Sequence, residues 1–133
     1  MSIARIAVAI ALLACLPLAG CKHGAAVESA AASFAGTYAG SLPCADCPGI
    51  DATLAFAPDG SYVETMSYRE RGVANTTRGH WSLEAGGKRV KLHADEANAS
   101  DAWMEIVSSG EIRMLDADGN PIDSPFDYSL HRK

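Results

Sequence analysis

The sequence has few cysteines, a deficit of positive charge and no long apolar run after its first residues. Its 11 Lys and Arg are outnumbered by 16 Asp and Glu, giving a formal net charge of -5, and this balance argues against nucleic acid as a partner. After the first apolar run, no stretch keeps a helical apolar period over three turns, which argues against a helical domain. No Ser/His/Asp arrangement or carboxylate pair can be assigned from residue spacing. We therefore expect a protein that is not an enzyme and does not bind nucleic acid.

The N-terminal residues have the pattern of an export signal. Arg5 supplies a positive charge, and residues 6–16 form an apolar run too short for a permanent membrane helix. Residues 18–21 place Leu, Ala and Gly before a cysteine, which resembles the lipobox cut by the lipoprotein signal peptidase. We interpret residues 1–20 as a lipoprotein signal peptide and Cys21 as the lipid attachment that anchors the chain to a membrane. The alternative is an ordinary secretory signal in which Cys21 is incidental.

Residues 21–35 are rich in alanine and serine and show no strand or turn pattern. We interpret them as the lipidated cysteine followed by a flexible tether, with a short alanine-driven helix as the alternative. Lys22 stands where an aspartate would resemble an inner-membrane retention signal. The prediction is therefore an outer-membrane lipoprotein that faces the periplasm.

Residues 36–133 alternate with a period of two and carry turn signals about every ten residues, a spacing typical of an antiparallel sandwich or barrel. Pro58, Asp59 and Gly60 form one such turn. We predict one all-β domain, a small antiparallel meander barrel whose closure removes exposed edges. Its expected strands are about eight, over residues 37–42, 50–57, 61–68, 77–83, 89–93, 103–107, 111–115 and 126–131. We expect this barrel to be a monomer.

The large side chains predict a filled barrel. Phe56, Trp81, Trp103 and Phe126 lie on expected strands and are large enough to occupy the interior of a barrel of this size. Such filling leaves little room for a ligand cavity. The histidines, which include His80 and His93, show no repeated ligand spacing, so we expect them to be surface or strand residues rather than metal ligands.

Cys44 and Cys47 are the cysteines expected to keep free side chains, because Cys15 leaves with the signal peptide and Cys21 carries lipid. Two cysteines separated by two residues can close a disulfide, bind a soft metal or exchange electrons with a partner. In an oxidising compartment the disulfide is the default. A loop this short restrains the unfolded chain by only about 2 kcal/mol, compared with nearly 5 for a loop of about a hundred residues. We therefore expect a functional pair that binds Cu(I) when reduced, with a structural bridge as the alternative.

A family resemblance starts at residues 36–50, whose letters are GTYAGSLPCADCPGI. It continues through Leu54, residues 59–62 and the closing residues 115–130. This pattern resembles the N-terminal domain of the copper-resistance lipoprotein NlpE family. The resemblance implies a barrel similar to bacterial lipocalins, a lipid anchor in the outer membrane, and roles in copper tolerance and in signalling envelope stress to a partner protein.

Three functions of different classes remain open. The first is an envelope lipoprotein whose Cys44–Cys47 pair responds to copper or to redox conditions. The second is a lipocalin-like carrier of a small apolar ligand. The third is a thiol-disulfide oxidoreductase, although Pro48 and Gly49 lead into a strand and not into the helix that lowers a thiol pKa in thioredoxin-like folds.

Overall fold

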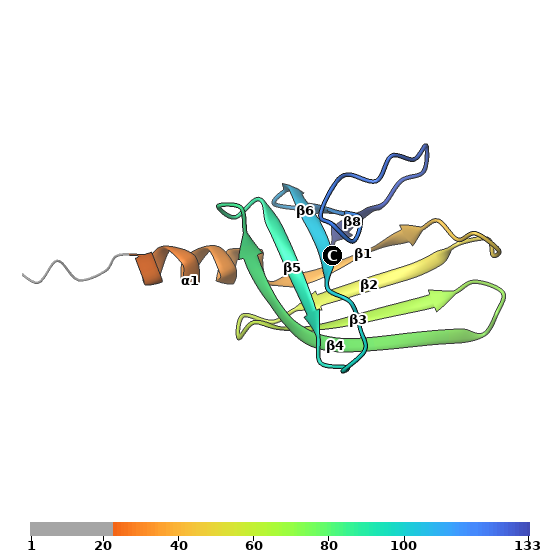
Figure 1. Cartoon of the computed structure of the whole chain (residues 1–133), viewed down its shortest axis with the longest axis horizontal. Coiled ribbons are helices and arrows are strands. Elements are labelled where there is room, and N and C mark those ends of the chain that lie inside the picture. Colours follow the sequence, from red (N-terminus) through yellow and green to blue (C-terminus); the bar gives the residue numbers. More distant parts are fainter. Residues whose placement is uncertain (1–22) are drawn as a thin grey trace, which may run out of the picture.

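The computed structural model describes residues 23–133, which form one helix followed by eight strands (Figure 1). No helix among these residues has both the length and the apolar character needed to cross a bilayer. The elements are α1 (His23–Phe34), β1 (Gly36–Leu42), β2 (Ile50–Phe56), β3 (Ser61–Tyr68), β4 (Val73–Glu84), β5 (Arg89–Ala94), β6 (Ala102–Ser108), β7 (Glu111–Met114) and β8 (Ser129–Arg132).

Each strand pairs antiparallel with the next, and β8 pairs with β1, so the sheet closes into a barrel. The predicted all-β meander barrel is confirmed. Tight turns favour pairing between strands that are consecutive in the chain. In the turn between β2 and β3, Gly60 has a φ of 88°, and the Asp59 carboxylate accepts a hydrogen bond from the Ser61 amide at 2.9 Å. This is the turn chemistry expected between two antiparallel strands.

Alternate residues of the strands point inward and form one core. The inward set of β2 is as predicted, with Ala52, Leu54 and Phe56 buried and Asp51 exposed. Side chains from strands all around the barrel meet at its centre, where five are 0% exposed: Leu54, Val90, Met104, Ile112 and Leu130. The centre of the barrel is therefore filled by its own side chains, in agreement with the expectation of a filled barrel.

Residues 23–34 form a helix, so the prediction of a flexible tether is wrong for this segment and the alanine-driven helix is the structure found. Alanine favours helix, but packing fixes the position of α1. Phe34 at its C-terminal end is 7% exposed and joins the core. Its ring lies 4.9 Å from that of Phe56 and 5.2 Å from that of Trp81, centroid to centroid. The folded unit therefore includes the end of the segment assigned to the tether.

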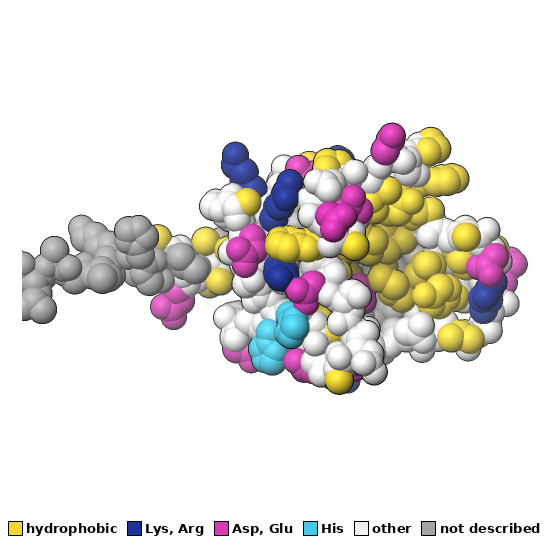
Figure 2. All heavy atoms as spheres, in the orientation of Figure 1, with side chains coloured by type: hydrophobic (Ala, Val, Ile, Leu, Met, Phe, Trp, Pro, Cys, Tyr) yellow, Lys and Arg dark blue, Asp and Glu magenta, His cyan; other side chains and the backbone are white. Residues whose placement is uncertain are grey.

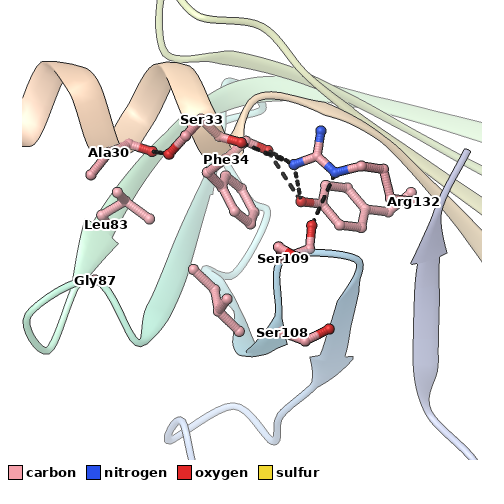
Figure 3. A pocket seen from close by; sticks show the side chains of 10 residues that line it. Ala30, Ser33, Phe34, Leu83, Gly87, Ser108, Ser109 and Arg132 are labelled. Atoms are coloured by element: carbon pink, nitrogen blue, oxygen red, sulfur yellow. Dashed lines mark hydrogen bonds between the residues drawn. The ribbon is translucent and has the colours of Figure 1, made fainter.

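Arg132 of β8 holds the C-terminal end of α1 against the barrel (Figure 3). Its guanidinium donates to the carbonyls of Ser33, Phe34 and Ala35 at 3.1, 2.9 and 2.9 Å. These carbonyls belong to the last turn of the helix and the residue after it, where helical partners are lacking. A positive charge at this place also favours the negative end of the helix dipole. A groove of about 220 Å³ lies beside the contact, between α1, the β4–β5 hairpin and the β6–β7 hairpin.

Two strand boundaries differ from the prediction by three or more residues, and the others differ by at most one. Residues 73–76, which precede the expected strand over 77–83, already belong to β4, whose first residue Val73 pairs with Tyr68. The side chains of residues 73–76 are all exposed. They therefore lack the alternation of buried apolar and exposed polar residues that could have indicated a strand. The last strand starts at Ser129 and not at Phe126, because the Asp127 carboxylate accepts a hydrogen bond from the Ser129 amide and turns the chain.

Two aromatic residues do not fill the barrel as expected. Phe126 precedes β8 and is 64% exposed. Trp103 is only partly buried and faces outward, since its neighbour Met104 takes the inward position at 0% exposure. The Lys91 ammonium lies 5.1 Å from the Trp103 ring centroid, and a Cβ built on Gly119 would come within 3.5 Å of that ring. The Trp103 ring is thus covered from outside the barrel by a lysine and a turn.

Candidate functional site

The loop of residues 43–49 joins β1 to β2 at the end of the barrel opposite α1 (Figure 1). Pro43 and Pro48 fix φ on both sides of the two cysteines and prevent a regular strand there. Gly49 ends the loop with a φ of 151°. A Cβ at this position would lie 3.3 Å from both Ser41 Oγ and Arg69 Nη1. The loop is therefore constrained by its own sequence and by the neighbouring side chains.

The predicted disulfide between Cys44 and Cys47 is present, with the two Cα atoms 5.3 Å apart. Both cysteines are half-buried at the tip of the hairpin, whereas Asp46 between them is exposed. The Cys44 sulfur lies 3.6 Å from the Asp46 carboxylate, and the Cys47 sulfur lies 3.4 Å from the Gly49 carbonyl oxygen. The pair is thus accessible from solvent at one edge and is close to a negatively charged group.

Within residues 23–133, Cys44, Asp46 and Cys47 bring three potential ligand atoms within 4.8 Å of one another. A disulfide sulfur has no thiolate to donate, so this group can bind a metal only after reduction. Two thiolates suit a soft ion such as Cu(I), whereas a carboxylate suits harder ions. The donor set therefore fits Cu(I) through the two sulfurs. Asp46 is a potential third ligand that the sequence spacing did not indicate.

Arg71, in the turn between β3 and β4, holds the cysteine loop from the side. Its Nη2 atom lies 2.5 Å from an Asp46 carboxylate oxygen and donates to the Asp46 backbone carbonyl at 3.0 Å. Figure 2 shows acidic and basic side chains together at this end of the molecule. This contact links the cysteine loop to a second hairpin, so a conformational change in the loop can be transmitted to the β3–β4 turn.

Arg69 makes a second link between the same two hairpins. Its guanidinium forms an ion pair with Asp51, and its backbone amide donates to the Gly49 carbonyl at 3.0 Å. The hydrogen bond from Arg69 is the main cause that lowers the pKa of Asp51. Both arginines lie between the third and fourth expected strands, over residues 69–76. Only strand pairing, which places the two hairpin tips at one end of the barrel, could have connected them with the cysteines.

Glu64 of β3 faces the inside of the barrel, because the register of the sheet pairs it with the buried Leu54 on one side; Thr77 is its partner on the other side. Burial raises the pKa of its carboxyl above the usual value. Glu64 lies two residues after Tyr62 on β3 and shares its inward face, where Tyr62 is only 4% exposed. Glu64 is therefore a titratable group directed into the barrel, separate from the cysteine loop.

The lipid-attachment prediction concerns Cys21, which lies outside the described residues. It stays a prediction, together with the signal peptide over residues 1–20. The described residues define a closed eight-stranded antiparallel barrel with a disulfide-bonded cysteine hairpin at one end. This is the class of small lipocalin-like β-barrel domains.

The family model for the NlpE N-terminal domain matches residues 38–125. The chain therefore belongs to the NlpE N-terminal domain family. The matched segment contains the cysteine hairpin and both arginine contacts to it, so the candidate site lies inside the family domain.

Two curated relatives are lipoproteins. The chain is 30% identical to lipoprotein NlpE of Escherichia coli K12 over 135 residues, covering 94% of this chain and 55% of that protein. It is 32% identical to the 17 kDa lipoprotein of Treponema pallidum over 91 residues, covering 63% of this chain and 58% of that protein. The chain thus spans a little more than half the length of these relatives.

Two solved structures share the fold. A putative lipoprotein from Shewanella oneidensis superposes with a TM-score of 0.63 at 27% identity, covering 75% of this chain and 89% of that one. The Cpx pathway activator NlpE of Escherichia coli superposes with a TM-score of 0.57 at 31% identity, covering 70% of this chain and 48% of that one.

Proposed function

We propose that this protein is an outer-membrane lipoprotein of the NlpE type, anchored through Cys21, that reports copper or redox conditions in the envelope to a signalling partner. The observation that carries the proposal is the Cys44–Cys47 disulfide at a hairpin tip, linked by Arg71 to a second hairpin. The Escherichia coli relative is described as a Cpx pathway activator, which supports a signalling role of this kind.

The chemistry of the proposed sensor follows from two exclusive states of the cysteine pair. A dithiol donor would supply two electrons and two protons to convert the disulfide into two thiols. Binding of one Cu(I) by both sulfurs would then release two protons. Because a sulfur in the disulfide cannot act as a thiolate ligand, oxidation and copper loading compete for the same two atoms. Reduction removes the disulfide constraint on residues 44–47, and Cu(I) bound by both sulfurs would replace it with a different one in the loop that contacts Arg71.

Metal binding by the proposed sensor is tested with the purified chain in its oxidised and reduced forms. We expect about one Cu(I) per reduced chain, competed against a chromogenic chelator, and none at this site in the oxidised chain. Cys44→Ser with Cys47→Ser should lose the site while the far-UV spectrum is unchanged. Equal Cu(I) uptake by the wild type and the double variant would disprove copper binding by the cysteines.

Signalling is tested in Escherichia coli cells that lack their own NlpE and carry a Cpx-dependent reporter. Expression of the wild-type chain should raise reporter output, and copper should change this output in the wild type more than in the Cys44→Ser/Cys47→Ser variant. Arg71→Met should reduce the copper response, since it removes the Arg71–Asp46 contact between the hairpins and keeps both cysteines. A reporter that responds equally to all three chains would contradict a role for the pair in signalling.

Anchoring is tested separately with Cys21→Ala. The variant should accumulate as an unprocessed precursor or appear in the soluble periplasmic fraction, because it has no thiol to carry the lipid. The wild type should fractionate with the outer membrane. A cleaved Cys21→Ala chain that still fractionates with membranes would contradict the lipid anchor.

Two structural features favour this proposal over the other functions considered. The side chains that fill the middle of the barrel, such as Leu54 and Met104 at 0% exposure, disfavour carriage of an apolar ligand there. Cys47 leads through Pro48 and Gly49 into β2, so no helix N-terminus is available to lower its thiol pKa as in thioredoxin-like oxidoreductases.

A further inference from the structure

His80 and His93 lie directly opposite each other on the outer surface of the barrel. His80 is on β4, and the register of the sheet pairs it with His93 on β5. Their side chains are 71% and 72% exposed. Cβ atoms of directly opposed residues in an antiparallel pair are about 4.5–5.5 Å apart. In Figure 2, histidine side chains form one patch next to acidic side chains.

A carboxylate orients each of the two imidazoles through the same ring nitrogen. His80 Nδ1 lies 3.1 Å from an Asp95 oxygen, and His93 Nδ1 lies 2.6 Å from an Asp101 oxygen. When Nδ1–H donates to a carboxylate, the neutral ring keeps the lone pair of Nε2 free. This carboxylate–histidine arrangement is the one that orients metal-bound histidines in proteins and makes them stronger ligands.

The Asp101 carboxylate, which orients His93, is held in place and ionised. The Lys91 ammonium lies 2.9 Å from the second oxygen of Asp101, and hydrogen bonds from Lys91 and His93 lower the pKa of Asp101. Asp59, in the turn before β3, also lies near His80; hydrogen bonds from Ser61 lower its pKa, and His80 adds a smaller contribution. The acids offset the positive charge of Lys91 around the histidines.

We propose that His80 and His93 form a cross-strand chelate for one divalent transition-metal ion, bound by the two Nε2 atoms and completed by water. Imidazole nitrogens suit Zn²⁺, Ni²⁺ and Cu²⁺ and do not suit Mg²⁺. The site lies on paired strands, which keep the two rings in register without the ion. The His80–His93 site contains no cysteine, so it can bind the metal ion while the Cys44–Cys47 disulfide is intact. No spacing along the chain indicates this pair, because strand register, and not chain distance, makes the two residues neighbours.

The experiment titrates Zn²⁺ into the full chain in detergent by calorimetry, without a polyhistidine tag and with the disulfide oxidised. We expect one Zn²⁺ per chain and no heat from Mg²⁺. His80→Ala and His93→Ala should each weaken Zn²⁺ binding at least tenfold. His131→Ala is the matched control, because His131 is an exposed histidine on β8, and it should bind Zn²⁺ like the wild type. A wild type that does not bind Zn²⁺ would overturn the proposal, as would unchanged binding by both variants or an equal loss in His131→Ala.

A second measurement separates the chelate from nonspecific binding to surface acids. Asp95→Asn and Asp101→Asn keep the side-chain shape but remove the charge that orients the ring, and each should weaken Zn²⁺ binding about 10–100-fold. Binding should weaken as the pH is lowered, because protons compete with the metal for the imidazole nitrogens. If His80→Ala left the affinity for Zn²⁺ unchanged while Asp95→Asn and Asp101→Asn weakened it, the bound ion would be held by carboxylates and the proposal would be wrong.

Discussion

The guanidinium of Arg132 donates a hydrogen bond to the Tyr38 hydroxyl at 2.7 Å, and Tyr38 in turn donates to the Phe34 carbonyl at 3.2 Å. This relationship joins the last strand, the first strand and the helix at one point, where the barrel closes. Arg132 also lies over the face of the Tyr38 ring, 4.9 Å from its centroid. The seam between β1 and β8 is therefore secured by a charged group as well as by backbone pairing.

We predict that Arg132→Met lowers the free energy of unfolding by about 1–3 kcal/mol, the range for hydrogen bonds that involve a charged group. The variant keeps the aliphatic part of the side chain but leaves the last helical carbonyls without their donor. Urea denaturation measures the loss, and far-UV circular dichroism should show less helix. Arg78→Met, an exposed arginine of β4, serves as the control and should change stability by less than about 0.5 kcal/mol. Equal stability of the two variants would contradict the role given to Arg132.

Replacement of two phenylalanines by alanine should lower the stability of the chain by very different amounts. Phe34 is 7% exposed and packs on three core aromatic rings, whereas Phe126 is 64% exposed. Phe34→Ala should cost about 3–5 kcal/mol, typical of a large core side chain replaced by alanine. Phe126→Ala should cost less than about 0.5 kcal/mol. Thermal unfolding of the two variants compares them directly, and similar losses would mean that α1 does not belong to the folded core.

The free energy of unfolding should depend on pH through Glu64. Burial raises the pKa of its carboxyl in the folded chain, so the folded state binds this proton more tightly than the unfolded state. Stability from this group is therefore present below the unfolded pKa of about 4.3 and is lost as the pH rises through the folded pKa. Glu64→Gln should raise the melting temperature at pH 7 and flatten this part of the profile. Glu96→Gln, at an exposed position, should do neither; a Glu64→Gln chain less stable than the wild type at pH 7 would contradict the argument.

The Cys44–Cys47 pair should contribute little to folding. In the chain-entropy account, a disulfide across so short a loop stabilises by about 2 kcal/mol at most. Cys44→Ser with Cys47→Ser should therefore fold with the same β-sheet spectrum and lose no more than this free energy of unfolding. Chemical denaturation of oxidised and reduced wild type should give the same difference. A double variant that fails to fold would assign the pair a structural role.

The sequence by itself determined the fold class and the cysteine loop. Period-two alternation in β2 and turn residues such as Gly60 act locally, so they could be recognised without knowing which strands meet. The same is true of Cys44 and Cys47, which are separated by two residues in a loop bounded by prolines. Here local chemistry decides the structure, and the structure agrees with the prediction.

Tertiary structure alone decided the features that depend on contacts between distant residues. Helix α1 is held by Phe34 in the aromatic core and by Arg132 from the far end of the chain, so alanine content alone could not separate a helix from a tether. Trp103 faces outward because Met104 takes the inward position in register with Val90. The opposition of His80 and His93, and the contact of Arg71 with Asp46, likewise arise from strand register and barrel closure, which bring together residues that no local pattern connects.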